Sequence, residues 1–131
     1  MINEGCLEGV DEVYGFHNVP SFKESSITVI SGTIMSSSTT LKITIFGKEG
    51  HASEAHKVSD VISCGASIIS NLHSVKQRGL ESKENAVFSI TKFEAGNSSD
   101  NFPSSAVILG TIRTLNMPAL HKIIELLKST A

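Results

Sequence analysis

Apolar and polar residues alternate most regularly in the stretch Leu41–Phe46, where every second residue is Leu or Ile and the residues between are Lys and Thr. A period of two places the apolar side chains on one face, so this stretch is predicted to be a half-buried strand. Two later stretches, Ala86–Phe93 and Ala106–Leu115, are rich in Val, Ile, Phe and Thr and are also predicted to be strands. The polar stretch 96–103 is predicted to be the loop that joins them.

Two other stretches have apolar residues at helical spacing. Asp60 is a suitable N-cap for the first helix, because its carboxylate can accept hydrogen bonds from free N–H groups of the first turn. Asn116 can cap the second helix, with Pro118 in the first turn, where the missing N–H costs nothing. The first helix is predicted to bury a wide apolar face, in which Val61, Cys64, Ile68 and Val75 broaden the line of Ile62, Ala66, Ile69 and Leu72, with Cys64 as a buried thiol. The second helix is predicted to bury Leu120, Ile123, Ile124 and Leu127.

The order of these elements from Leu41 onward is strand, helix, strand, strand, helix. This is the order of a ferredoxin-like α+β fold, an antiparallel sheet with two helices on one face, without its final strand. Residues 1–36 do not fit this pattern and are expected to be loop or extended chain. Residues 37–131 are expected to form the α+β domain.

Composition and charge exclude several classes of protein. The 131 residues are 40% hydrophobic and 18% charged, which suits a packed domain and not a disordered tail. A net charge of −2 gives no basic surface for nucleic acid. The sequence has no secretory signal and no apolar run long enough to span a membrane, so we expect no membrane partner and a cytoplasmic location.

Among the five histidines, His51 and His56 are the candidates for chemistry, because they lie in a glycine-flanked loop between a predicted strand and a predicted helix. Chance placement of histidines in a loop explains their spacing equally well. His73 and His121 fall on predicted helices and are expected to be ordinary surface residues. No HExxH pattern, nucleophile elbow or glycine-rich phosphate loop is present.

Four segments in order resemble one enzyme family. They are YGFH at 14–17 with Pro20, GKEGHASEAH at 47–56 followed by Asp60, Pro103 with Ala106, and GTIRT at 110–114. They are similar to segments of the aminoacylase, hippurate hydrolase and carboxypeptidase family of metal-dependent amidohydrolases. The resemblance extends over nearly the whole chain.

The resemblance implies that residues 37–131 are the lid, or dimerisation, domain of such an enzyme and that residues 1–36 are a remnant of its catalytic domain. It implies that His17 is a metal ligand and that His51 polarises the amide carbonyl, often in the active site of the partner subunit. It assigns substrate binding to His56, Asp100, Asn101 and Arg113, with the Arg113 guanidinium holding a carboxylate.

The sequence also departs from the family pattern. Asp100 stands where the family has Asn, although Asn101 is adjacent, and Ser104-Ser105 replace the family's Asp-Glu. The other metal ligands of the family are absent, so the chain is expected to be a fragment that resembles part of a metallopeptidase and is not catalytically competent alone. The divalent metal of the intact enzyme (zinc, manganese or cobalt) is not expected to bind to this chain by itself.

The expected partners are the catalytic domain of a parent enzyme and a second copy of the chain, paired through the lid. The alternative is a non-catalytic module of the same fold that binds or associates with itself. The drifted positions Asp100, Ser104 and Ser105 favour this alternative, and strand addition at a sheet edge is a physical route to it.

Overall fold

The computed structural model describes residues 1–79 and 86–130, and the side chains of residues 75–79 and of 130 lie outside the description. The chain consists of two units, Met1–Ile30 and Ser31–Ala131, each described by itself. The first unit has one short 3-10 helix, η1 (Ile2–Glu4), and is otherwise extended or turned. Its apolar side chains are exposed, and Tyr14 and Phe16 are each 87% exposed.

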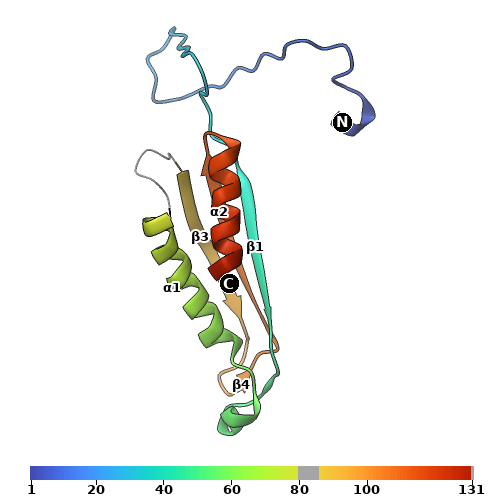
Figure 1. Cartoon of the computed structure of the whole chain (residues 1–131), viewed down its shortest axis with the longest axis vertical. Coiled ribbons are helices and arrows are strands. Elements are labelled where there is room, and N and C mark those ends of the chain that lie inside the picture. Colours follow the sequence, from blue (N-terminus) through green and yellow to red (C-terminus); the bar gives the residue numbers. More distant parts are fainter. Residues whose placement is uncertain (80–85, 131) are drawn as a thin grey trace. The chain divides into compact units, whose positions relative to one another are not determined.

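The second unit contains a three-stranded antiparallel sheet. Its strands are β1 (Thr39–Phe46), β3 (Ala86–Ala95) and β5 (Ser105–Thr114), in the order β1-β5-β3. The three strands predicted from the sequence therefore share one sheet, with β5 in the centre and β1 and β3 at its two edges (Figure 1). Alternating burial along β1 confirms the predicted period of two.

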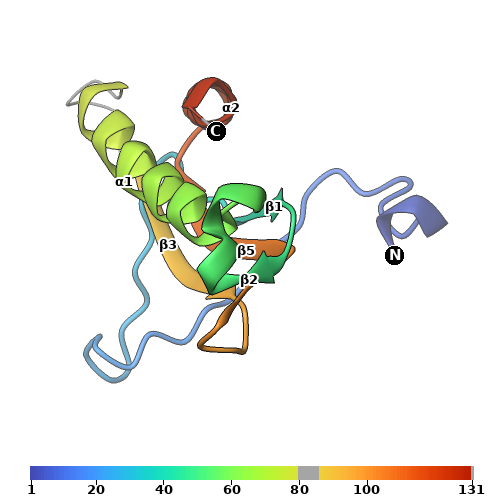
Figure 2. The same ribbon diagram turned by 90° about the horizontal axis from the view of Figure 1, so that it is seen from below.

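Two helices, α1 (Val61–Gly79) and α2 (Met117–Thr130), cover one face of this sheet (Figure 2). The predicted α+β architecture is confirmed: the order is strand, helix, strand, strand, helix. The core lies between the helices and the sheet and consists of Ile68, Leu72, Phe88, Ile108, Ile112, Leu120, Ile123 and Leu127.

Both predicted helix caps are present. Asp60 Oδ1 accepts hydrogen bonds from the backbone N–H of Ile62 at 2.9 Å and of Ser63 at 3.0 Å. Asn116 Oδ1 accepts from the N–H of Ala119 at 2.9 Å. Each cap satisfies N–H groups that the helix itself leaves without partners, which fixes the residue at which the helix begins.

The predicted buried face of α1 is correct on one side and wrong on the other. Val61, Ile68 and Leu72 are buried as predicted, whereas Ile62 is 41% exposed and Ala66 and Cys64 are exposed. The side chain of Val75 lies outside the described residues. Gly65 explains which side faces the sheet, because a Cβ there would lie 2.6 Å from Cε2 of Phe93. The absence of a side chain lets the helix approach the sheet closely at this point.

Small elements extend the far end of the sheet. They are β2 (Gly50–His51), the 3-10 helix η2 (Ala52–Lys57) and β4 (Asn101–Phe102). The predicted loop 96–103 therefore contains a two-residue strand, which pairs with β2. Within the described part of the chain, no helix is both long and apolar enough to cross a membrane.

Candidate functional site

The candidate site is the corner formed by β2, η2 and β4, where β1 ends and β5 begins (Figures 1 and 2). In the β2–β4 pair, Gly50 lies opposite Phe102 and His51 lies opposite Asn101. The N–H of Ala52 donates to the carbonyl of Asp100 at 2.8 Å. Two segments fifty residues apart in the sequence are thus held side by side, and His51 and Asn101 become neighbours.

Backbone contacts fix the position of this corner. The N–H of Gly47 donates to the carbonyl of Ser104 at 2.8 Å, and the N–H of Ser59 donates to the carbonyl of Lys48 at 3.1 Å. Gly50 lies so close to its neighbour that a Cβ there would come within 2.6 Å of Cγ1 of Val58. Close packing against Val58 therefore explains why residue 50, next to His51, is a glycine. These contacts give the loop a defined structure, in which His51 is exposed.

The His51 side chain is exposed, and one of its nitrogens is already engaged. Its Nδ1 accepts the backbone N–H of Ser53 at 3.2 Å and lies 2.8 Å from the Ser53 hydroxyl oxygen. A nitrogen that accepts an N–H needs its lone pair, so the neutral imidazole carries its proton on Nε2. His51 thus presents an N–H donor on its outer side. Ser53 is a contact of His51 that was not predicted from the sequence, although serine side chains often bond to residues two positions away in a loop.

Asn101 and Asp100 supply the remaining polar groups of the corner. Asp100 Oδ1 accepts the hydroxyl proton of Ser98 at 2.6 Å. A shallow cavity of about 240 Å³ is lined by Glu49, Gly50, Asn101 and Phe102. The corner combines an imidazole N–H, an amide that both donates and accepts, and carboxylates that only accept. This set can bind and orient a polar group such as an amide.

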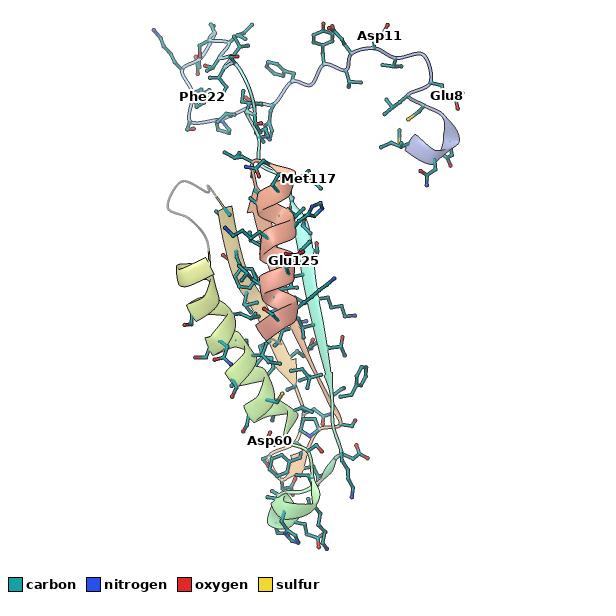
Figure 3. All side chains as sticks on the ribbon, viewed as in Figure 1. Glu8, Asp11, Phe22, Asp60, Met117 and Glu125 are labelled. Atoms are coloured by element: carbon teal, nitrogen blue, oxygen red, sulfur yellow. The ribbon has the colours of Figure 1, made fainter. Side chains whose placement is uncertain are left out.

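Asp60 lies at the start of α1, next to this corner (Figure 3). The Ser63 hydroxyl donates to Asp60 Oδ2 at 2.5 Å, in addition to the backbone bonds of the cap. The Ser63 hydroxyl and backbone N–H lower the pKa of the Asp60 carboxyl below its ordinary value, since they stabilise the ionised form. Asp60 is therefore an anionic helix cap whose oxygens are occupied.

The other two predicted substrate-binding residues of the second unit occupy different positions. His56 is exposed within η2, five residues beyond His51. Arg113 is exposed on β5 opposite Val87, near the end of the strand. Arg113 lies eight positions beyond Ser105, at the corner, which corresponds to about 26 Å of extended strand. Arg113 and His51 are not brought together within one copy of the chain.

His17, the predicted metal ligand, belongs to the first unit. Its Nδ1 lies 3.0 Å from the carbonyl oxygen of Asn18, and since a carbonyl only accepts, Nδ1 carries the proton. Nε2 is then the nitrogen with a lone pair, as a metal-ligating histidine requires. Among the described residues, however, no three His, Cys, Asp or Glu side chains are placed to hold a metal ion.

The sequence profile described as Peptidase dimerisation domain, M20_dimer, matches residues 35–131. The second unit, with its α+β sandwich and the corner that carries His51, therefore belongs to the peptidase dimerisation domain family. The expected resemblance to the metal-dependent amidohydrolases is confirmed.

Relatives of known name extend the similarity to the first unit. The chain is 37% identical over 131 residues to N-acetylcysteine deacetylase of Bacillus subtilis (strain 168). This match covers 100% of this chain and 34% of the deacetylase. It is 32% identical over 118 residues to hippurate hydrolase of Campylobacter jejuni, covering 88% of this chain and 31% of the relative. The chain thus spans about a third of the length of the curated relatives it matches.

A solved structure gives the same result. The crystal structure of a Bacillus subtilis protein described as a dinuclear metal-binding peptidase of the M20 family is similar to this chain with a TM-score of 0.69. The identity is 29%, and the match covers 98% of this chain and 31% of that one. The second unit therefore has the fold of a peptidase dimerisation domain of the M20 family.

Proposed function

We propose that this chain acts as the lid and dimerisation domain of a metal-dependent hydrolase of amide bonds, with an N-acyl amino acid or a peptide as substrate. The observation that carries the proposal is the state of His51. The side chain is exposed, its Nδ1 is engaged by Ser53, and its Nε2–H is free to donate. A fixed donor aimed at the oxygen on which charge develops is an effective way to lower the barrier of amide hydrolysis.

The neighbouring polar groups would bind and orient the substrate around that donor. Asn101, opposite His51 in the β2–β4 pair, would hydrogen-bond the amide or carboxylate of the substrate. Asp100 would accept hydrogen bonds, and His56 would approach from η2. Arg113 would hold a carboxylate through its guanidinium.

The distance of Arg113 from the corner indicates that His51 and Arg113 of one copy would serve two different active sites of a homodimer. About 26 Å of strand separates Arg113 from the start of β5, so one small substrate does not reach both Arg113 and His51 of the same copy. We propose that His51 acts in the active site of a partner copy, whereas Arg113 serves the site of its own copy. A homodimer formed through the lid is part of this proposal.

The metals of the proposed enzyme would be held mainly outside this chain. When bound, a pair of divalent metals activates a water for attack on the amide carbonyl. His17 would contribute one ligand through Nε2, but the described residues offer no complete set of ligands. We therefore propose that the chain alone is not a catalyst.

A chimera tests the proposal. The third of Bacillus subtilis N-acetylcysteine deacetylase that aligns with this chain would be replaced by it, and hydrolysis of N-acetylcysteine measured. We expect activity in the chimera and a fall in kcat of about 10²–10³-fold in its His51→Ala variant. The matched control is His121→Ala, an exposed histidine on α2, which we expect to keep kcat within about twofold.

Two results would contradict the proposal. One is an active chimera in which His51→Ala has no effect. The other is turnover, or tight binding of one or two metal ions, by the 131-residue chain alone.

A further inference from the structure

The cavity at the corner contains a carboxylate that is not engaged by any other described residue. Glu49 lines this cavity of about 240 Å³ together with Gly50, Asn101 and Phe102. It is exposed, and its side chain forms no ion pair or hydrogen bond with another residue of the described chain. A carboxylate accepts hydrogen bonds and attracts cations. The cavity therefore offers one anionic group to a ligand.

The carboxylates of Glu54 and Asp100, which lie in the same corner, already have partners. Glu54 Oε1 lies 2.6 Å from Nζ of Lys57. Asp100 Oδ1 accepts the Ser98 hydroxyl proton at 2.6 Å. These two side chains are satisfied within the chain, and this distinguishes them from Glu49.

The lysines closest to Glu49 in the sequence do not neutralise it. Lys57 is paired with Glu54, and Lys48 forms no ion pair with Glu49 although the two residues are adjacent. This fits the rule that successive side chains of an extended chain point to opposite faces. The positive charge that complements Glu49 must therefore come from a ligand.

The other residues that line the cavity suit an organic cation. Phe102 is half buried, and its partner in the β2–β4 pair is Gly50, which has no side chain to cover the ring from the opposite strand. An aromatic ring attracts a cation to its face, and the side-chain oxygen of Asn101 can accept an N–H. No three His, Cys, Asp or Glu side chains of the described residues are placed to hold a metal ion, so the lining fits an ammonium group better than a metal.

The position of Glu49 relative to His51 indicates which part of a substrate would carry this ammonium group. The two residues are two positions apart, about 7 Å along an extended chain. An ammonium group on a flexible four-carbon stem, as in lysine, spans a similar length. Because both residues belong to the same corner, they would contact the same substrate molecule.

We infer that Glu49 is a specificity-determining residue that selects N-acyl amino acids whose side chain ends in an ammonium group. This inference rests on the proposed function, because it places the scissile amide at the Nε2–H donor of His51 and the ammonium group at Glu49. Asn101, which lies opposite His51 and lines the cavity, would contact the substrate between these two points.

Two substrates that differ by one charge test this inference in the chimera. Nα-acetyl-lysine and Nα-acetyl-norleucine have side chains of similar size, but only the first carries an ammonium group. We expect Glu49→Gln to lower the ratio of kcat/KM for the lysine compound to kcat/KM for the norleucine compound by about fivefold, as the loss of one exposed ion pair implies. Glu54→Gln is the matched control, because it removes the same charge from the same corner at a residue that does not line the cavity, and it should leave the ratio unchanged.

Nuclear magnetic resonance of the 131-residue chain tests the ammonium site without hydrolysis. We expect Nα-acetyl-lysine to shift the amide signals of residues 49–51 and 101–102 more than Nα-acetyl-norleucine does, and Glu49→Gln, but not Glu54→Gln, to abolish this difference. A ratio that Glu49→Gln leaves unchanged, an equal fall in Glu54→Gln, or equal shifts with both compounds overturns the inference. A chimera that hydrolyses no substrate contradicts the proposed function, and the spectra of the chain then decide on the ammonium site by themselves.

Discussion

Asp60 caps the N-terminus of helix α1. It accepts two backbone N–H groups and the Ser63 hydroxyl. Asp60→Ala is expected to lower the free energy of unfolding by about 1 kcal/mol, because the capped N–H groups lose their acceptor. Asp60→Asn keeps an acceptor but loses the charge, so it is expected to lose less stability than Asp60→Ala at pH 7. Urea unfolding of the three proteins measures the difference, and equal losses in both variants would contradict a capping role.

The same residue gives a pH dependence with a defined sign. Its pKa is lowered in the folded chain, so the ionised carboxylate contributes stability that is present above its ordinary pKa of 3.8 and lost as the pH falls through the lower folded value. Stability of the wild type should therefore fall more steeply below pH 4 than that of Asp60→Asn. Parallel curves for the two proteins would show that the carboxylate has no such role.

His51 and His17 are expected to be opposite tautomers when neutral. Nδ1 of His51 accepts an N–H, so its proton is on Nε2, whereas Nδ1 of His17 donates to a carbonyl, so its proton is on Nδ1. The ¹⁵N chemical shifts of the two imidazoles at pH 8.5 report this directly. Each residue serves as the control for the other. A His51 ring protonated on Nδ1 would remove the donor on which the proposed function depends.

At the scale of elements, substitutions in helix α1 show which of its apolar residues contribute to stability. Leu72 is 1% exposed, and Leu72→Ala is expected to cost about 2–5 kcal/mol through lost burial and a cavity. Cys64 is exposed, so Cys64→Ser is expected to change the free energy of unfolding by less than about 0.5 kcal/mol. Both values come from chemical unfolding. A large loss for Cys64→Ser would support the burial of this thiol that the sequence predicted.

The same helix shows how far the sequence could predict the fold. Period-two alternation in β1 and the caps Asp60 and Asn116 gave the elements, because each of these signals is local. Which side of the wide apolar face of α1 is buried was not predictable in this way, since both Val61-Gly65-Ile68 and Ile62-Ala66-Ile69 are apolar at helical spacing. The choice between them is made by Phe93, which packs against Gly65 from a strand distant in the sequence.

The site shows a similar division. Asn101 and Arg113 were selected by resemblance to a family, whereas His51 was also a candidate because it lies in a glycine-flanked loop. The pairing of His51 with Asn101 depends on two-residue strands, which are too short to show any period. The separation of Arg113 from the corner follows from the length of β5 and was within reach of the sequence. The hydrogen bond from Ser53 to His51, which determines the tautomer, required the structure.

At the scale of the whole molecule, all of the buried hydrophobic residues described belong to the second unit. Removal of residues 1–30 is therefore expected to leave the free energy of unfolding of the domain within about 0.5 kcal/mol of its value in the full chain, because no core contact is lost. Thermal and urea unfolding of residues 31–131 beside the full chain measure the change. A large loss would mean that the first unit contributes to the stability of the domain.

A cut a few residues later should behave differently, and this makes the matched control. Ser37 donates its backbone N–H to the carbonyl of Thr114 at 2.7 Å, and its hydroxyl oxygen lies 3.0 Å from Oγ1 of Thr114, which is 1% exposed. A chain that begins at Thr39 loses both contacts and leaves polar groups of Thr114 without partners, at a cost of about 1–3 kcal/mol. Ser37→Ala removes only the hydroxyl and should fall between the two truncations. If the two truncated chains were equally stable, the domain would begin at β1 itself, and Ser37 would be part of the connection.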